Sequence, residues 1–321
     1  MTAKNKQYLA FDFGGTKLSV AIGKTGRLNQ KTIFSPPKVT ATEQYRLMVE
    51  MAQHLLVDNN ASPIGIGVSF GGPVQAEKGI VRISYHVPGW EGFPLAARLK
   101  AQFGLQGAVV IDNDANTAAL GEFCFGAGQG CQSLLYVTVS TGIGGGWIIN
   151  GQPFHGADGL AGEIGHIQIE SSSSALPCNC GRHGCLEAEA CGLAIAQRAK
   201  LYLKNHPEHG QRLRDLVEGK LYQLSAAHVS QAASEGDQLS WQVLKVAATQ
   251  LGRGLAQALN MLNPERIILG GGVIKAGEVW WQTVRETAQE YTLQGISVNI
   301  HPAELGDDAT LWGAMALARK M

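Results

Sequence analysis

Four glycine clusters, each placed directly after an apolar run rich in β-forming residues, constrain this chain more than any other feature. They are Gly14-Gly15, Gly71-Gly72, Gly142 to Gly146 and Gly270 to Gly272. Glycine accounts for 41 of the 321 residues, yet the clusters follow no fixed period. Glycine after a strand marks backbone that turns tightly or approaches a ligand closely. The clusters predict several loops that grip a phosphate-rich ligand; the alternative is four ordinary tight turns.

Strand and helix patterns alternate twice along the chain. The expected strands cover residues 8–13, 18–22, 64–70, 108–111, 134–139, 147–150, 266–269 and 296–300. The expected helices cover residues 40–57, 115–125, 186–204, 240–262, 278–291 and 309–319, and residues 205–224 give no readable pattern. Because 321 residues exceed the usual size of one domain, the alternation predicts an α/β fold with two lobes flanking a cleft.

The charge of the chain is balanced, with 26 basic and 26 acidic residues. Nucleic acids and anionic membranes select basic surfaces, so neither is expected as a partner. No apolar stretch approaches eighteen residues, and residues 1–7 lack the apolar core of a signal peptide. We therefore expect a cytoplasmic protein that binds neither nucleic acid nor membrane.

The first glycine cluster joins two strands and carries an acid before it and a lysine after it. This hairpin differs from a P-loop, whose glycines open a helix. The amides bared by Gly14 and Gly15, together with Thr16 and Lys17, would face phosphates, while Asp12 would hold magnesium through water. The alternative is a plain hairpin with a buried structural acid.

Three further strand ends carry candidate ligand groups. Ser140 to Gly146, with the hydroxyl of Thr141 and the amide of Gly142, forms a flexible loop suited to a second phosphate contact. Gly271 and Gly272 could let a flat base lie against the backbone. Asn113-Asp114 ends a strand and opens a helix, so Asp114 is either an N-cap or a functional acid at the ligand-binding edge of the fold.

Three cysteines lie within eight residues: Cys178, Cys180 and Cys185. In a chain without a secretion signal, such spacing indicates a metal rather than disulfides. Zinc takes four protein ligands in structural sites, and the fourth would be His166 or His183. The pattern predicts a structural zinc site.

Two glutamates, Glu163 and Glu187, bracket the cysteine-rich loop. A metal-pinned loop would hold both carboxylates rigidly. Fixed carboxylates beside a histidine suit a polyol, because each can accept hydrogen bonds from neighbouring hydroxyls. The alternative is that both are solvated surface charges.

Together these segments resemble the ROK family, which contains bacterial sugar kinases and sugar-responsive repressors. The resemblance covers nearly the whole chain and rests on five segments: residues 12–17, 113–116, 140–146, 163–166 and 178–187. It implies the actin-like ATPase (ribonuclease H-like) fold. The lobes would then be residues 1–117, with the C-terminal helix 309–321 packed back on them, and residues 118–308, which carry the zinc loop.

The resemblance also implies roles for individual residues. Asp114 would be the catalytic base, and sugar hydroxyls would be bound by Asn113, Asp114, Glu163, His166 and Glu187, with Gly72 against the sugar. Zinc would be held by His166, Cys178, Cys180 and Cys185, which favours His166 over His183. The phosphate and magnesium contacts would come from Asp12, Gly14, Gly15, Thr16, Lys17, Thr141, Gly142, Gly271 and Gly272.

The implied activity is transfer of the γ-phosphoryl group of ATP, with Mg2+, to the 6-hydroxyl of a hexose. Glucose is the first expectation, followed by N-acetylmannosamine, N-acetylglucosamine, mannose and fructose. The family also implies a homodimer. A sugar-sensing regulator and a protein-binding ATPase are the competing hypotheses.

Two segments depart from the family pattern. Kinases of the family often carry an Asn-containing turn before Pro-Gly-Trp, whereas Tyr85-His86-Val87 stands there in this chain. Any sugar contact made by that Asn is therefore in doubt here. Ser171 to Ser174 resembles a tolerated extension between His166 and Cys178.

Overall fold

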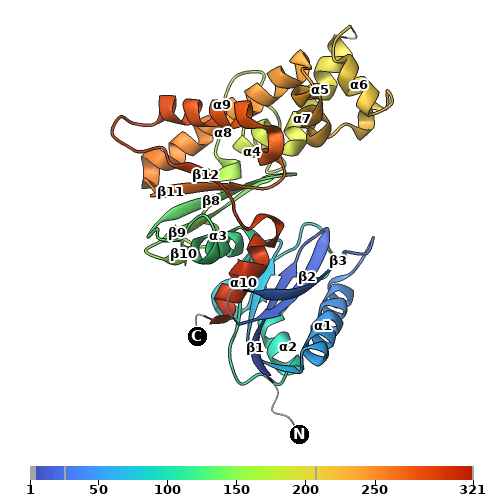
Figure 1. Ribbon diagram of the computed structural model, residues 1–321, viewed down its shortest axis with the longest axis vertical. Helices are drawn as coiled ribbons and strands as arrows, with labels where there is room; N and C mark the ends of the chain where they lie inside the picture. The colour runs from blue at the N-terminus through green and yellow to red at the C-terminus, as the bar shows by residue number, and fades with distance from the viewer. Residues whose placement is uncertain (1–4, 25–26, 207, 320–321) are drawn as a thin grey trace. The chain divides into compact units, whose positions relative to one another are not determined.

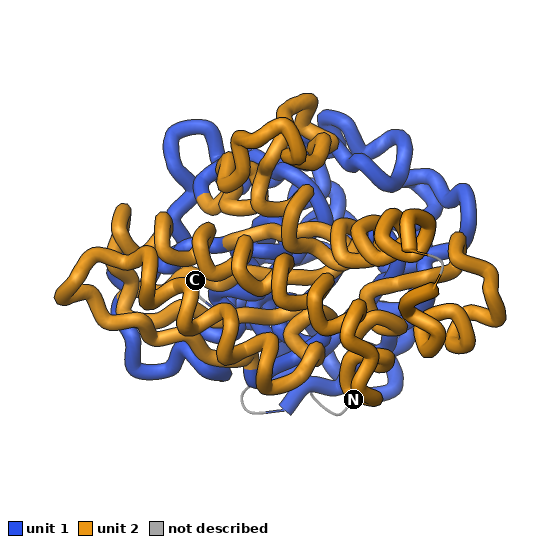
Figure 2. The backbone as a smooth tube through the Cα atoms, turned by 90° about the horizontal axis from the view of Figure 1, so that it is seen from above, with its two compact units in different colours: residues 1–132, 146–161, 304–321 blue, residues 133–145, 162–303 orange. Residues whose placement is uncertain are grey.

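The computed structural model describes residues 5–24, 27–206 and 208–319 (Figure 1). Two compact units are present: residues 1–132, 146–161 and 304–321 form unit 1, and residues 133–145 and 162–303 form unit 2 (Figure 2). The lobe boundaries expected from the sequence stay a prediction, and residues 320–321 of the expected terminal helix lie outside the described part. Among the described residues, no helix has both the length and the apolar character needed to cross a membrane.

A five-stranded sheet in the order β3-β2-β1-β4-β7 forms the centre of unit 1. Its strands are β1 (Asn5–Phe13), β2 (Lys17–Gly23), β3 (Leu28–Phe34), β4 (Ala61–Phe70) and β7 (Val109–Asn113). The antiparallel pairing of β1 with β2 confirms the predicted hairpin, whereas β1, β4 and β7 run parallel. Edge strand β3 was not predicted, because its mostly exposed residues carry no apolar alternation.

The other elements of unit 1 cover this sheet or connect its strands. They are α1 (Ala41–Asp58), β5 (Val74–Gln75), η1 (Ala76–Lys78), β6 (Ile80–Val81), α2 (Leu95–Gln102), α3 (Asp114–Phe125), η5 (Gly306–Asp308) and α10 (Ala309–Arg319). Helix α1 begins as the capping pattern predicts, since the Thr40 hydroxyl accepts the Glu43 N–H at 3.4 Å.

The two faces of β1 are covered by different helices. Successive side chains of a strand point to opposite faces, so Leu9 and Phe11 share one face while Ala10 and Asp12 share the other. Leu9 and Phe11 belong to the large apolar core that includes residues of α1 and α2. Ala10 packs against Ala314 of α10. The α10 face is therefore the face on which Asp12 lies.

The second sheet has the order β10-β9-β8-β11-β12. Its strands are β8 (Leu134–Val139), β9 (Ile143–Ile149), β10 (Gln152–Phe154), β11 (Arg266–Gly270) and β12 (Ile300–Pro302). The boundary between the two units falls within β9. The strand expected at residues 296–300 is wrong, since only Ile300 of that range is extended in a ladder.

The flexible loop expected from Ser140 to Gly146 is half wrong, because β9 begins at Ile143. Gly145 and Gly146 lie within the strand. A Cβ atom at Gly146 would stand 2.6 Å from the Ala115 carbonyl oxygen, and one at Gly145 would stand 2.6 Å from that of Gly162. These glycines therefore permit close backbone packing rather than loop mobility.

The helices of unit 2 are grouped around the 25-residue α8. They are η2 (Ile164–His166), α4 (Leu186–Ala190), α5 (Gly192–Asn205), α6 (Gln211–Leu216), η3 (Leu221–Gln223), α7 (Ala226–Ser234), α8 (Gln238–Leu262), η4 (Val273–Ala276) and α9 (Glu278–Tyr291). The single helix expected over residues 186–204 is wrong. Cys191 breaks it with extended backbone (φ −74°, ψ 170°), and its sulfur accepts the Ala194 N–H at 3.4 Å as the cap of α5.

Helix α10 approaches its neighbours so closely that two positions exclude a side chain. A Cβ atom at Gly313 would stand 1.7 Å from the Thr117 carbonyl oxygen of α3, and one at Gly67 would stand 1.8 Å from that of Ala314. We expect Gly313→Ala to lower the free energy of unfolding by about 1–3 kcal/mol, the usual cost of overpacking, in guanidinium melts. Gly272→Ala is the control, because no atom lies within 4 Å of its Cβ position. Equal stability of the two variants would contradict this account of the packing.

Candidate functional site

Three parallel strands of unit 1 end in register. Asp12 of β1 pairs with Ser69 of β4, and Ser69 pairs with Asp112 of β7. The carboxyl ends of parallel strands meet at the same edge of a sheet, where α/β folds bind ligands. The residues that follow each strand, among them Gly71-Gly72 and Asn113-Asp114, therefore lie together on one edge with the β1–β2 hairpin.

Asp12 lies beneath the hairpin, on the face covered by α10. The Thr310 hydroxyl of α10 donates to Asp12 Oδ2 at 3.0 Å. Removal from solvent raises the pKa of Asp12 above its usual value, against the opposing effect of hydrogen bonds from Ser69 and Thr310. A cation beside this carboxylate would favour its ionised form, so the environment of Asp12 suits the predicted magnesium role.

The hairpin turn leaves no room for a side chain at its first position. The Gly14 N–H donates to the Lys17 carbonyl oxygen at 3.1 Å, and a Cβ atom at Gly14 would stand 2.6 Å from that oxygen. The buried side-chain amide of Gln44 lies behind the turn, accepting the Trp90 indole N–H at 2.9 Å and donating to the Gly14 carbonyl oxygen at 3.5 Å. Gly15 and Thr16 remain exposed at the tip.

The predicted phosphate-facing lysine is engaged elsewhere in this structure. Lys17 Nζ lies 3.0 Å from Asp307 Oδ2, and both side chains are exposed. Exposed ion pairs contribute little free energy, so this pair is easily exchanged for another anion.

The sequence left open whether Asp114 caps helix α3 or serves as a functional acid. Asn113 is the N-cap, and its Oδ1 accepts the Asn116 N–H at 2.7 Å. Asp114 is the first residue of the helix, and its Oδ1 lies 2.9 Å from the Ala115 nitrogen, which donates to it. The capping role belongs to Asn113, which leaves the functional reading of Asp114 in place.

In unit 2 the loop between β8 and β9 is tied to Glu187 of α4. Glu187 Oε2 accepts the Ile143 N–H at 2.9 Å. A Cβ atom at Gly142 would stand 2.5 Å from the same oxygen, so glycine is needed for the contact. Glu187 is thereby fixed in place beside Thr141 and Gly142 rather than free in solvent.

Gly271 and Gly272 lie next to that loop at the end of β11, which pairs in parallel with β8. Gly271 has a left-handed backbone (φ 89°), and a Cβ atom there would stand 2.4 Å from the Val139 carbonyl oxygen. Gly272 has no atom within 4 Å of its Cβ position. The two predicted nucleotide loops of unit 2 are therefore neighbours, and Gly272 leaves open backbone for a ligand.

Four potential metal ligands converge in unit 2. The ligand atoms of His166, Cys178, Cys180 and Cys185 all lie within 4.8 Å of one another. Cys178 Sγ lies 3.6 Å from His166 Nδ1, and Cys180 Sγ lies 3.6 Å from Cys185 Sγ. Of the two histidines that the sequence left open, His166 joins the cysteines.

His166 presents its two ring nitrogens to different partners. Nδ1 faces the cysteine cluster, whereas Nε2 lies 4.0 Å from Glu163 Oε2. A histidine that ligates a metal through one nitrogen commonly places its other nitrogen near a carboxylate. The imidazole of His166 therefore lies between the cysteine cluster and Glu163.

The cysteine-rich loop is closed by backbone and by Arg182. The Cys178 N–H donates to the Arg182 carbonyl oxygen at 2.7 Å, and the guanidinium donates to the His166 carbonyl oxygen at 2.9 Å. A hydrogen bond from Arg182 lowers the pKa of Cys180 to about 6, whereas burial raises that of Cys185 to about 12. Arg182 thus favours a thiolate at the exposed end of the cluster.

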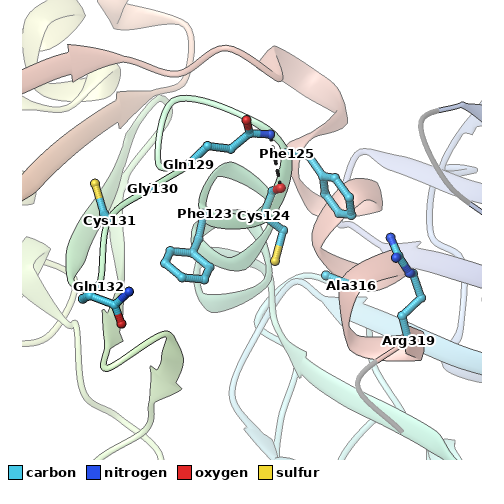
Figure 3. A pocket seen from close by; sticks show the side chains of 9 residues that line it. All are labelled: Phe123, Cys124, Phe125, Gln129, Gly130, Cys131, Gln132, Ala316 and Arg319. Atoms are coloured by element: carbon cyan, nitrogen blue, oxygen red, sulfur yellow. Dashed lines mark hydrogen bonds between the residues drawn. The ribbon is translucent and has the colours of Figure 1, made fainter.

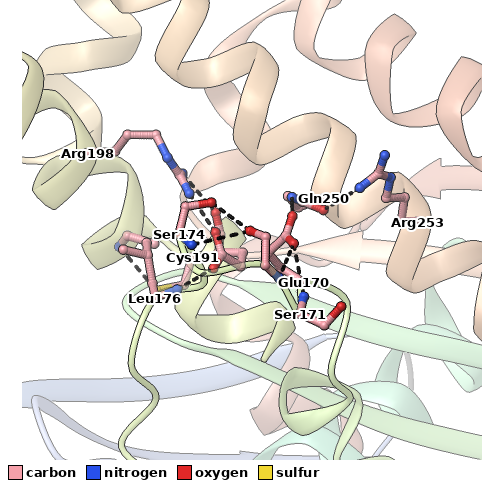
Figure 4. A network of polar contacts seen from close by, with 11 residues as sticks. Glu170, Ser171, Ser174, Leu176, Cys191, Arg198, Gln250 and Arg253 are labelled. Carbon is pink, nitrogen blue, oxygen red and sulfur yellow. Dashed lines mark hydrogen bonds and ion pairs between the residues drawn. The ribbon is translucent and has the colours of Figure 1, made fainter. Parts of the chain in front are cut away.

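Two carboxylates hold the segment between His166 and Cys178 (Figure 4). Glu170 Oε1 accepts the N–H groups of Ser171 and Ser172, both at 2.9 Å, so the expected serine extension is an ordered turn. Glu189 is 3% exposed, and its Oε1 accepts the Leu176 N–H at 2.8 Å. Arg198 of α5 neutralises Glu189, with Nη2 2.7 Å from Oε2.

A pocket of about 610 Å³ lies elsewhere in unit 1 (Figure 3). It is lined by Phe123, Cys124, Phe125, Gln129, Gly130, Cys131, Gln132, Ala316 and Arg319. None of the predicted site residues lines it, so the pocket is separate from the strand-end site of unit 1.

Sequence reasoning missed Asp112, His155 and Thr310, which contact or precede the predicted site residues of unit 1. Asp112 directly precedes Asn113-Asp114, and His155 Nε2 lies 2.7 Å from its carboxylate. Thr310 contacts Asp12 from the far end of the sequence. The acid at a strand end was a visible signal for Asp112, whereas nothing in the spacing of His155 or Thr310 indicates these contacts.

Comparison with known proteins identifies the family. The ROK family profile matches residues 8–321, and the chain belongs to this family. A glucokinase of Halalkalibacterium halodurans is 34% identical over 98% of this chain and 96% of its own length. A ROK glucokinase of Streptomyces griseus, solved with glucose and AMPPNP, superposes with a TM-score of 0.80 at 31% identity over 98% of this chain and 100% of that one.

A ROK hexokinase of Thermus thermophilus superposes with a TM-score of 0.82 at 31% identity, over 97% of each chain. These likenesses confirm the predicted family and the α/β fold of the actin-like ATPase kind.

The ion pair between Arg198 and Glu189 is expected to hold the segment that leads into the cysteine-rich loop. We expect Arg198→Met to lower the free energy of unfolding by about 3–5 kcal/mol, because it leaves a buried carboxylate unpaired. Lys220→Met, which removes the exposed partner of Glu218, is the control and should change stability by less than about 0.5 kcal/mol. Thermal and guanidinium unfolding measure both, and similar losses in the two variants would contradict the assignment.

Proposed function

We propose that this chain is an ATP-dependent hexose kinase that transfers the γ-phosphoryl group to the 6-hydroxyl of glucose. The observation that carries the proposal is the shared sheet edge of unit 1, where Asn113-Asp114 lies with the glycine hairpin that follows Asp12. The glucokinase relatives bear out the predicted activity at the level of an ATP-dependent hexose kinase. The choice of glucose, the residue roles and the zinc ion are proposals.

Asp114 would accept the proton of the attacking sugar hydroxyl. Asn113, Asp114, Glu163, His166 and Glu187 would hydrogen-bond sugar hydroxyls, and Gly72 would lie against the ring. The fixed position of Glu187 beside Ile143 and the placement of His166 Nε2 near Glu163 support these assignments. Rigid placement matters because phosphoryl transfer depends on positioning more than on covalent chemistry.

The nucleotide would be bound by backbone amides at strand ends. Gly14, Gly15, Thr16 and Lys17 of the hairpin, with Thr141 and Gly142, would contact phosphates, and Gly271 and Gly272 would lie along the base. Mg2+ that accompanies ATP would neutralise charge on the transferring group. Asp12 would hold it, and the raised pKa of Asp12 is consistent with a carboxylate that awaits a cation.

The His166, Cys178, Cys180 and Cys185 cluster fits zinc. Ligand sulfurs about 2.3 Å from a tetrahedral zinc stand about 3.8 Å apart, and the Sγ atoms of Cys180 and Cys185 are 3.6 Å apart. Zinc would act structurally there, by fixing the loop that bears His166 and leads into Glu187. His183 lies outside the cluster.

An assay of ADP release with ATP and Mg2+, across hexoses and N-acetylhexosamines, tests the proposal. The highest kcat/KM for glucose would support it. A preference for N-acetylmannosamine, N-acetylglucosamine, mannose or fructose would keep the kinase and replace the substrate. No sugar-dependent turnover by zinc-loaded protein that binds ATP would favour a sugar-sensing regulator. We further propose a homodimer, as the family resemblance implies, and a cytoplasmic location, as the sequence predicts.

Removal of the proposed base should affect chemistry more than binding. We expect Asp114→Ala to fold and bind glucose but to lose at least about a hundredfold in kcat, the low end for a general base. Steady-state kinetics and glucose titration measure the two effects separately. Near-normal turnover would exclude Asp114 as the base.

Removal of one cysteine should couple metal to sugar. We expect Cys180→Ser to lose bound zinc and to weaken glucose binding together, because the loop would no longer hold His166. Elemental analysis and calorimetric titration measure the two quantities, with Cys124→Ser as a control cysteine outside the cluster. Loss of zinc with unchanged glucose affinity would refute the coupling.

A further inference from the structure

We propose that His155 is a positioning residue that holds the Asn113-Asp114 turn through the carboxylate of Asp112. The inference rests on the proposed function, which makes Asp114 the catalytic base. His155 follows β10 and belongs to unit 1, as do Asp112 and Asp114. No family motif used above contains either His155 or Asp112.

Asp112 is a buried hub with three donors. It is 2% exposed, and its Oδ2 lies 2.7 Å from His155 Nε2. Its Oδ1 accepts the Asn113 N–H at 2.8 Å and the Asn116 side-chain amide at 3.0 Å. A carboxylate bound by several donors has little freedom to rotate, so His155 fixes the oxygen pair that orients the next residue.

The residues fixed by Asp112 are those that shape the proposed catalytic turn. Asn113 Oδ1 accepts the Asn116 N–H at 2.7 Å, and the Thr117 hydroxyl donates to the Asn113 carbonyl oxygen at 2.6 Å. Asp114 lies between these anchored positions. Its carboxylate direction therefore depends on the same network that ends at His155.

The charge around His155 supports an ionic interaction. Two acidic groups face it, Asp112 on β7 and Glu77 on η1. The hydrogen bond with Asp112 is the main cause that raises the pKa of His155, and partial burial opposes it. The imidazolium form supplies the countercharge that a buried carboxylate such as Asp112 requires.

The loop that carries His155 is itself anchored. The Ala161 N–H donates to the His155 carbonyl oxygen at 3.0 Å, and Arg82 Nη1 donates to the Asp158 carbonyl oxygen at 2.9 Å. The imidazole is therefore presented from a closed loop rather than from a free segment. This loop leads directly to the chain position of Glu163.

A double-mutant cycle with a conservative rescue tests the proposal. We expect His155→Phe to lower kcat about tenfold, the value of one hydrogen bond to a charged group, with the KM for ATP unchanged. His155→Gln retains a donor and should stay within about twofold of wild type. Asp112→Asn should also lower kcat, and the double variant His155→Phe/Asp112→Asn should lose less than the product of the single losses.

Amide hydrogen exchange provides a readout that needs no turnover. The Asn113 and Asn116 amides should exchange faster in His155→Phe than in wild type or His155→Gln. If wild type phosphorylates no sugar, the proposed function fails, and exchange alone decides the positioning role. Unchanged kcat and exchange in His155→Phe, or equal losses in His155→Gln and His155→Phe, would overturn it.

If His155→Phe does not fold, the pH dependence of the free energy of unfolding tests the ionic pair between His155 and Asp112 instead. A histidine whose pKa is higher in the folded than in the unfolded state stabilises the fold. Its contribution is complete at pH values below the pKa of the unfolded state, about 6.5. That contribution disappears as the pH rises through the folded value. Wild type should therefore exceed His155→Gln in stability at pH 5–6 by more than at pH 9, and a constant difference would overturn the ionic pair.

Discussion

The in-register parallel pairing of β1, β4 and β7 is the constraint on which the rest of unit 1 depends. It places Asp12, Ser69 and Asp112 at one level of the sheet, so that the residues after them share an edge. The period of a strand is two residues, and a slip of one residue in β1 would turn Asp12 away from α10. It would also bury Asp12 among the apolar side chains around Phe11. Core packing and site geometry are therefore specified by the same register.

Much of this could be predicted from the sequence because the signals were local. The hairpin around Gly14-Gly15, helix α8 and the spacing of the three cysteines each depend on residues close together in the chain. The family resemblance added the fold and His166. What failed was of a different kind. Ser140 to Gly146 suggested a mobile loop, but Gly145 and Gly146 permit the close approach of β9 to Gly162 and Ala115.

The other wrong predictions also follow from tertiary contacts that override local pattern. Residues 186–204 have helical composition throughout, yet Cys191 adopts an extended backbone and caps a second helix with its sulfur. The phosphate contact expected of Lys17 stays a prediction, and in this structure its Nζ pairs with Asp307 from 290 residues away. Edge strand β3 lacks apolar alternation because most of its residues are exposed to solvent. Local sequence patterns do not show these tertiary contacts.

Buried carboxylates show why chemistry and scaffolding are hard to separate by sequence. Glu122 is fully buried and accepts backbone N–H groups of Ala127, Glu304 and Leu305. Asp112 similarly accepts donors from its surroundings, and it stands two residues from Asp114. The two acids look alike in sequence, although Asp112 lies in β7 and Asp114 begins α3. Their hydrogen-bond partners differ. The Asp112 carboxylate is bound by Asn113, Asn116 and His155, and these contacts hold the turn in place. Asp114 has a different place in the chain: it is the first residue of α3, and its Oδ1 accepts the Ala115 N–H at 2.9 Å. The same turn therefore contains one acid held in the sheet and one at the start of a helix, a difference that their spacing in the sequence does not reveal.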